Sequence, residues 1–337
     1  MTTTDTSSTT TDRQSFDFAR WWDRYGILFV LIALVLIMAA IAPNFASMDN
    51  FWNIARAISI NAILAAGMTF VIITAGIDLS VGSTVAVAGV VSVMVSITGV
   101  PAPLAVLIGI LAGAIAGLIN GILVAYMALA AFIVTLASMT FLRGLAYTLT
   151  GGQPIVDGNL NFRALGSGSL LGIPAPVIAM IIVYLVAWFL LENTTYGRHV
   201  YAVGGNPEAA RLAGVNVKAV IASVYVIAGA CAGLAGLLFA GRVVSAQPTA
   251  GEGYELDAIA AVVLGGTSLA GGKGRIVGTF IGALILGVLT TGLILMNVPF
   301  FTQLLVKGIV IVIAVSIDSL KQKRISFGRR RTQPAAA

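Results

Sequence analysis

The chain has 337 residues, 58% of them apolar and only 9% charged, and its formal net charge is +6. So few charged residues cannot cover a water-exposed surface, and apolar stretches long enough to cross a bilayer recur along the whole chain. The composition excludes a soluble domain with a single anchor and predicts an all-α, polytopic membrane protein. Cys231 and His199 are the only residues of their kinds, so a disulfide framework is excluded and neither a metal nor a cofactor is expected.

The first 25 residues are polar and rich in Thr and Ser, which predicts a disordered cytosolic leader before a membrane domain at 26–318. The first apolar run is longer than a signal-peptide h-region and is followed by Pro43, so we expect an uncleaved first span. Ten spans are predicted, at 26–42, 58–75, 81–98, 104–125, 131–149, 174–191, 219–241, 256–270, 276–296 and 301–317. The eighth is short, and two interpretations stay open: it crosses fully, or it dips in and returns as a re-entrant segment.

Basic residues are distributed unevenly between the two sides of these spans. If all ten spans cross and the N-terminus lies inside, fourteen Lys and Arg residues fall in internal segments, four in external segments, and Lys307 within a span. This positive-inside bias predicts that both termini, including the basic tail at 319–337, lie in the cytoplasm. Nucleic-acid binding is not expected of so short a tail. We expect the Lys307 ammonium group to extend to the outer interface, with a role in transport as the alternative.

The helical pattern breaks between the second and third predicted spans, at residues 74–83. Asp78, followed by Ser80, is typical of a helix start, where a carboxylate accepts hydrogen bonds from backbone N–H groups. An acid so close to the bilayer is also a candidate for binding a substrate or a proton. Both interpretations stay open, with capping favoured because its spacing is explicit.

Glycines recur every four residues along the fourth span, at Gly109, Gly113, Gly117 and Gly121. They form one stripe along which another helix can approach closely, so helix packing is the predicted role. Asn120, beside the stripe, either faces a pathway through the membrane or hydrogen-bonds a neighbouring helix.

The longest predicted cytosolic loop, 192–218, contains a short helix. Asn206 suits the N-cap of this helix, Pro207 its first position and Gly214 its end. The small residues between them give the helix a nearly smooth face, which fits docking of another protein or packing against the chain's own membrane domain.

Eight glycines fall between residues 265 and 287, around a turn that carries Lys273 and Arg275. Glycine permits positive φ and close backbone contact, so helices can bend back and pack tightly there. The turn is not a P-loop, because Thr267 stands where the first glycine is needed and Gly274 where the magnesium-binding Ser or Thr is needed. The chain is therefore not expected to be an enzyme that hydrolyses ATP.

Three segments carry a family resemblance: AGIDLSVGS at 75–83, YAVGGNPEAARLAGVNV at 201–217, and SAQPTAGEGYELDAIAAVVLGGTSLAGGKGRIVG at 245–278. Together they resemble the permease subunits of bacterial ATP-binding cassette (ABC) sugar importers of the ribose/xylose class. The resemblance implies the ten-helix arrangement of large-substrate (type II) importers, in the bacterial inner membrane and in contact with membrane lipid. It also implies a homodimer, an ABC ATPase on the cytosolic side, a periplasmic sugar-binding protein, and a sugar as cargo, with ribose first.

Site residues follow from the resemblance and from the few polar residues of the spans. The resemblance implies coupling to the ATPase through Gly205, Asn206, Glu208, Ala209 and Gly214. Polar residues in or beside the spans are candidates for the pathway of an uncharged polyhydroxyl cargo, namely Asn61, Asp78, Asn120 and Thr135. External cations are candidates for docking the binding protein, namely Arg56, Arg163 and Arg242.

One function of a different class is kept as the alternative. A self-sufficient, proton-coupled secondary transporter of a small polar solute would use Asp78, Glu255 or Asp257 to carry protons. These acids lie mainly at the ends of spans, which favours the ABC permease. A membrane-embedded enzyme is not expected, because the sequence offers no catalytic constellation.

Overall fold

The computed structural model of the chain describes residues 18–313 and 316, with side chains described from residue 26 onward. Helix α1 (Phe18–Ile41) begins inside the segment predicted to be a disordered leader, since residues 18–25 contain neither Gly nor Pro and continue directly into the first apolar run. The leader before residue 18 and the basic tail at 319–337 lie outside the described residues. The disorder of the leader and the cytoplasmic location of both termini stay predictions.

Helices make up nearly all of the regular structure. After α1 come α2 (Met48–Ile73), α3 (Val81–Ile97), α4 (Ala102–Ala125), α5 (Ala131–Thr150), α6 (Arg163–Ser167), α7 (Ala175–Asn193), α8 (Thr195–Gly205), α9 (Pro207–Leu212), α10 (Val217–Val243), α11 (Tyr254–Leu264), α12 (Ile276–Leu295) and an apolar helix at Phe300–Ile313. Each of the ten predicted spans coincides with one helix. Six helices of the described region are long and apolar enough to cross a membrane, and shorter apolar helices accompany them. The predicted all-helical membrane fold is confirmed at this level.

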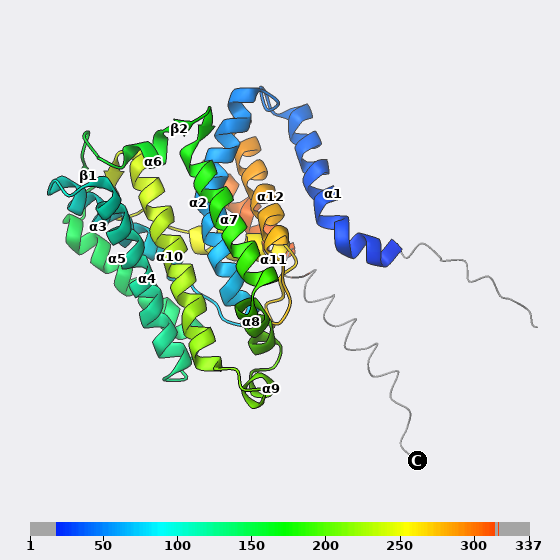
Figure 1. Cartoon of the computed structure of the whole chain (residues 1–337). Coiled ribbons are helices and arrows are strands. Elements are labelled where there is room, and N and C mark those ends of the chain that lie inside the picture. Colours follow the sequence, from blue (N-terminus) through cyan, green and yellow to red (C-terminus); the bar gives the residue numbers. More distant parts are fainter. Residues whose placement is uncertain (1–17, 314–315, 317–337) are drawn as a thin grey trace, which may run out of the picture.

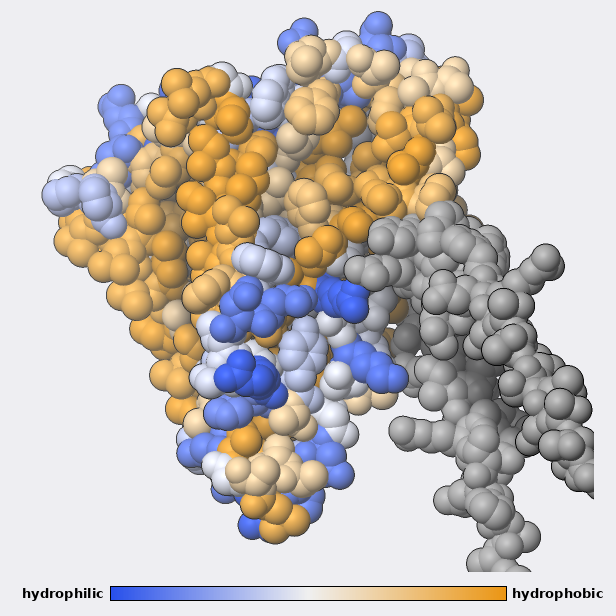
Figure 2. Space-filling view, turned by 45° about the vertical axis from the view of Figure 1, so that its right-hand side comes forward, coloured by the Kyte–Doolittle hydropathy of each residue, from blue (hydrophilic) through white to orange (hydrophobic). Residues whose placement is uncertain are grey.

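Two small antiparallel strand pairs lie at one end of the molecule. One joins β1 (Ile155–Val156) to β4 (Ser245–Ala246), and the other joins β2 (Ser169–Leu170) to β3 (Ile173–Pro174). In Figure 1 these strands and α6 lie at the end opposite α8 and α9. Figure 2 shows an apolar surface over the upper part of the molecule and polar residues gathered toward the lower end. On this face a broad apolar region thus lies above a polar end at α8 and α9, and a few further polar residues lie along the upper edge.

Helix α2 is the centre of the bundle. In its most apolar stretch 83% of the residues are buried, against 22% in α4 and in α5 and 28% in α7. It packs against α7, α10, α11 and α12, and its residues form the middle of the largest core cluster. The outer helices expose many large apolar side chains, as is expected where the surroundings are lipid or another apolar surface rather than water.

The glycine stripe of α4 packs against α10, as predicted. A Cβ atom on Gly121 would lie 2.7 Å from the carbonyl oxygen of Ala222, and one on Gly113 would lie 2.8 Å from the Gly233 backbone. Gly229 of α10 meets the α4 backbone in the same way, so the two helices are in backbone contact through small residues on both sides.

Two non-helical segments, the first break at 74–80 and the second break at 247–253, bring the N-termini of α3 and α11 together inside the bundle. Residues 74–80 separate α2 from α3, and residues 247–253 separate β4 from α11. The backbones of Gly82 and Gly251 are so close that neither position has room for a Cβ atom. Helix α11 has 11 residues and is about 16 Å long, which is shorter than the hydrocarbon core of a bilayer at about 30 Å.

The segment that contains the eighth predicted span runs from one end of the bundle to the other, although α11 alone is short. This segment begins before the predicted span, at β4, which follows the C-terminal end of α10 and pairs with β1. The glycine-rich turn at its far end hydrogen-bonds to the end of α2 and to Tyr201 of α8, near the N-terminal side of α10. Because the extended residues 247–253 supply the remaining length, the segment ends at the other end of the bundle.

Candidate functional site

The break between α2 and α3 is held by a network of polar side chains. The Asp78 carboxylate accepts hydrogen bonds from the backbone N–H of Ser80 at 2.9 Å and from its hydroxyl at 2.6 Å. The Asn120 amide donates to the Ser80 hydroxyl at 2.8 Å, and the Ser138 hydroxyl donates to the Asn120 amide oxygen. Asp78 thus bonds to the N-cap residue Ser80 and not to an N–H group in the first turn of α3, which differs from the capping expected of it.

Three of the four pathway candidates lie at this break. Thr135 of α5 donates to the carbonyl oxygen of Ile77 at 3.2 Å, and Tyr225 of α10 donates to the same oxygen at 3.3 Å. Asp78, Asn120 and Thr135 are all buried. Their polar groups satisfy one another and the unwound backbone, as is required where a helix is broken in apolar surroundings. The geometry accounts for them as the support of the break.

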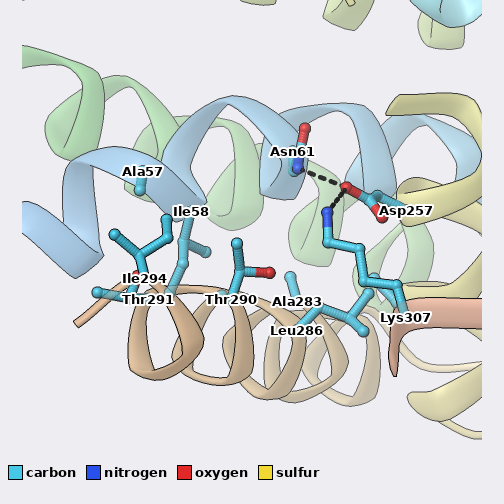
Figure 3. A pocket seen from close by; sticks show the side chains of 12 residues that line it. Ala57, Ile58, Asn61, Asp257, Ala283, Leu286, Thr290, Thr291, Ile294 and Lys307 are labelled. Carbon is cyan, nitrogen blue, oxygen red and sulfur yellow. Dashed lines mark hydrogen bonds and ion pairs between the residues drawn. The ribbon is translucent and has the colours of Figure 1, made fainter. Parts of the chain in front are cut away.

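The fourth candidate, Asn61 of α2, lies in a different place. Its amide donates to the Asp257 carboxylate at 3.3 Å, and the Lys307 ammonium donates to the same oxygen at 2.8 Å. Figure 3 shows the three side chains converging at one end of a cavity of about 90 Å³, whose wall includes Thr290 and Thr291 of α12. The prediction that Lys307 extends to the interface is wrong, because an acid 50 residues away in the sequence pairs with it inside the bundle. No local pattern could have indicated this partner.

The short helix α9 begins and ends as predicted. The Asn206 side chain accepts hydrogen bonds from the backbone N–H groups of Glu208 at 3.1 Å and Ala209 at 3.0 Å. At the other end Gly214 has φ +84°, and its N–H donates to the carbonyl of Arg211, while the next N–H donates to that of Ala210. This is the Schellman arrangement, for which glycine is suited because the left-handed conformation costs it little.

Helix α9 lies at the tip of the polar end (Figure 1), and most of its residues are exposed. Leu212 is 77% exposed, so the tip presents one large apolar side chain to its surroundings. Hydrogen bonds from the Arg211 guanidinium, and its charge, lower the pKa of the Glu208 carboxyl below its usual value, so this pair is ionised at neutral pH. The position at the tip favours docking of another protein over packing against the chain's own membrane domain.

The glycine-rich turn at 265–275 links α8 to the end of α2. The Gly272 N–H donates to the carbonyl of Ile73 at 2.8 Å, and the Tyr201 hydroxyl of α8 donates to that of Gly274 at 2.9 Å. Gly204 of α8 lies so close to Ile73 and Gly272 that a Cβ atom there has no room. The coupling candidates on α8 and α9 are thus joined through one turn to the segment that leads into the break at 74–80.

The three docking candidates do not form one cluster of neighbouring residues on a single element. Arg163 begins α6 and Arg242 lies in the last turn of α10, two elements that pack together through Gly166, and both side chains are exposed. Arg56 belongs to α2 and is partly buried. Arg143, which no sequence pattern marks as a site residue, donates to the carbonyls of Pro248 and Ala250 at 2.6 and 2.8 Å and so fixes the second break.

Among the described residues no group of three His, Cys, Asp or Glu side chains could hold a metal ion.

Comparison with known proteins adds the family. Residues 50–315 match a family described as branched-chain amino acid transport system / permease component. The chain is 48% identical to the ribose import permease protein of Escherichia coli K12, over 94% of this chain and 100% of the relative. It is 39% identical to the D-allose transport system permease protein of the same organism, over 95% and 99% of the two chains, and 40% identical to its L-arabinose transport system permease protein, over 96% and 98%.

No solved structure matches the chain significantly. The family match covers most of the chain, and the relatives are similar over nearly their whole length. The resemblance inferred from the three sequence segments is confirmed, as is the expectation of a transport subunit without an ATPase domain of its own. The chain belongs to the family of permease components of bacterial ABC importers, multi-pass proteins of the inner membrane.

Proposed function

We propose that this chain is the membrane subunit of an importer whose cargo is ribose or a closely related sugar. The observation that carries the proposal is the 48% identity to the ribose import permease, which extends over the full length of that relative and exceeds the 39–40% shared with the D-allose and L-arabinose permeases. A separate ATPase supplies the energy and a periplasmic binding protein supplies affinity for the sugar. The permease alternates between an outward-open and an inward-open state, and it requires no tight binding site of its own.

Uptake of labelled sugars tests this function. Proteoliposomes that contain the chain with its ATPase partner, with binding protein outside and ATP inside, are expected to accumulate ribose in preference to L-arabinose and D-allose. Uptake that requires ATP hydrolysis supports an ABC importer. Ion-driven uptake by the chain alone would overturn the proposal in favour of a secondary transporter, and a preference for another sugar would correct the substrate.

We propose further that ten segments cross the membrane, that both termini are cytoplasmic and that two copies form a homodimer surrounded by lipid. The coincidence of ten predicted spans with ten helices and the exposed apolar faces of α4, α5 and α7 support this arrangement. In a Cys231→Ala background, single cysteines at Asn159 and at Ala209 are expected to react with an impermeant maleimide from opposite sides of the membrane. Labelling of both from one side would exclude this topology.

Coupling to the ATPase is proposed for the tip formed by α9, with Gly205, Asn206, Glu208, Ala209 and Gly214 shaping it. Its exposure at the polar end, the exposed Leu212 and the capped, rigid ends of α9 support this role. Motion of the tip would reach the helix break through α8 and the glycine-rich turn. Docking of the binding protein at the opposite end is proposed for Arg56, Arg163 and Arg242.

A further inference from the structure

A cavity of about 360 Å³ lies beside the point at which the N-termini of α3 and α11 meet. Its polar lining comes from three elements and the second break, namely Ser83, Thr140, Arg143, Tyr147, Glu252 and Glu255. None of the pathway candidates from the sequence lines it. In membrane transporters, discontinuous helices whose N-termini face a cavity within the bundle are a recurrent setting for substrate contacts.

Ser83 is the most informative residue of the lining. Its side chain is only 1% exposed, yet within the described residues its hydroxyl has no hydrogen-bond partner. Other buried hydroxyls of the same region, such as those of Ser80 and Ser92, are satisfied. A buried hydroxyl without a partner lowers stability unless a molecule in the cavity bonds to it. Ser83 therefore points to an occupant with hydrogen-bonding groups.

Arg143 supplies donors on the same cavity. Both of its hydrogen bonds, to the carbonyls of Pro248 and Ala250, are made by Nη1, so in the described structure Nε and Nη2 donate to no protein acceptor. A guanidinium presents its donors in a fixed plane, which suits adjacent hydroxyl oxygens. The clamp on residues 248 and 250 holds this plane in place.

Glu252 and Glu255 supply acceptors, and Tyr147 supplies an aromatic ring that is 40% exposed. Donors and acceptors in the same lining match hydroxyl groups, each of which donates and accepts. The ring face of Tyr147 suits the C–H face of a sugar. With two carboxylates and one guanidinium the lining carries a net negative charge, which disfavours phosphorylated or acidic sugars. The lining therefore fits a neutral polyhydroxyl molecule.

We propose that this cavity is the site at which the permease itself contacts the sugar, with Ser83, Arg143 and Glu255 bonding to its hydroxyl groups and Tyr147 against its ring. This inference rests on the proposed function, that the cargo is a sugar. The proposed contact site lies at the second break, residues 247–253. The pathway candidates from the sequence, Asp78, Asn120 and Thr135, instead support the first break, residues 74–80.

The test compares Ser83→Ala and Glu255→Gln with the unmodified complex of permease, ATPase and binding protein. Ribose uptake per ATP hydrolysed is expected to fall at least tenfold for Glu255→Gln and severalfold for Ser83→Ala, while ATPase stimulation by the binding protein is retained. The preference for ribose over its 2-deoxy and 3-deoxy analogues is expected to narrow for at least one analogue. A purely structural role would not change the preference among analogues.

Ser92→Ala is the matched control, since it removes a buried hydroxyl from the same helix whose bond goes to the Ala88 carbonyl instead. It is expected to leave the preference unchanged. If Glu255→Gln does not assemble, Tyr147→Leu at a more exposed position replaces it, with the same expected loss. The inference would be overturned if the assembled variants kept both the ribose uptake per ATP hydrolysed and the preference for ribose over its deoxy analogues. If instead the unmodified complex imports no sugar, the proposed function fails.

Discussion

At the scale of single residues, the Asp257–Lys307 ion pair is the main departure from what the sequence suggests. Its side chains are 12% and 21% exposed, so both charges are largely withdrawn from water and depend on each other. Asn61 adds a hydrogen bond to the same carboxylate oxygen. The pair joins three elements far apart in the chain, namely α2, α11 and the apolar helix Phe300–Ile313, and we expect it to stabilise their packing.

The stability of the purified protein tests this role. Removing one partner leaves a charge in low-dielectric surroundings, so Lys307→Met is expected to lower the free energy of unfolding by up to about 3 kcal/mol. Replacing both residues, as in Asp257→Asn with Lys307→Met, is expected to recover most of the loss, because no unpaired charge remains. Thermal melting in detergent measures both variants. A single variant that melts like the unmodified protein would show that the pair does not stabilise the fold.

At the scale of elements, the contact between α4 and α10 depends on glycine. At Gly117 the α4 backbone lies against the carbonyl of Tyr225, and at Gly121 against Ala222. Such close approach increases van der Waals contact between the two helices. This contact takes the place of contact between each helix and lipid. The same helix pair positions Asn120 and Tyr225 at the first break, so the packing of these helices also determines the geometry of the break.

A matched pair of glycine substitutions tests the contact. Gly117→Ala is expected to lower the free energy of unfolding by about 1–3 kcal/mol, because the added methyl group requires the helices to separate. Gly144→Ala is the control, since a Cβ atom at that helical position meets nothing within 4 Å. It is expected to leave the melting temperature nearly unchanged. Equal effects of the two substitutions would mean that helix propensity, rather than helix contact, determines the result.

At the scale of the whole molecule, contacts run without interruption from the polar tip to the inside of the bundle. The tip at α9 is joined by α8 to the glycine-rich turn, and the turn bonds to Ile73 at the end of α2. The break at 74–80 follows directly. We propose that a movement of the tip is transmitted along these contacts to the helices that meet at the two breaks.

Charge substitution at the tip tests the coupling role. Glu208→Lys is expected to abolish ATP-dependent sugar uptake while membrane insertion and melting temperature are retained, because the Glu208 side chain is exposed and contributes little to the fold. Exchanging the pair, Glu208→Arg with Arg211→Glu, restores the local ion pair but not the charge at each position. This exchanged variant is expected to lack ATP-dependent sugar uptake as well. Recovery of uptake in the exchanged variant would mean that only the stability of α9 matters.

Docking at the opposite end has a separate test. Reversal of Arg56, Arg163 and Arg242 to Glu is expected to reduce stimulation of the ATPase by the binding protein at least tenfold at low salt, with basal ATPase activity unchanged. Added salt is expected to weaken the stimulation of ATPase activity in the unmodified complex, because it screens the attraction between the arginines and the binding protein. It is expected to have little effect on the variant, which lacks this attraction. Unchanged stimulation after triple reversal would exclude these arginines as docking groups.

The predictions that succeeded depend on local sequence. The ten helical segments follow from apolar runs, the caps of α9 follow from Asn206 and Gly214, and the contact role of the α4 stripe follows from glycine spacing. Each of these features is determined within one segment of the chain. The partner of Lys307 and the role of Arg143 were not predictable, because each depends on a group about 50 or more residues away.

The sequence alone therefore determined the membrane class, the helical segments, the turns and caps, and the family resemblance, since composition, periodicity and short motifs carry this information. Only the tertiary structure decided which polar residues share a site. It separated Asn61 from Asp78, Asn120 and Thr135, and it brought Ser83 and Arg143 to one cavity with Glu255. The physical reason is that buried polar groups must be satisfied by whichever segments pack against them, and that packing is fixed only when the whole bundle forms.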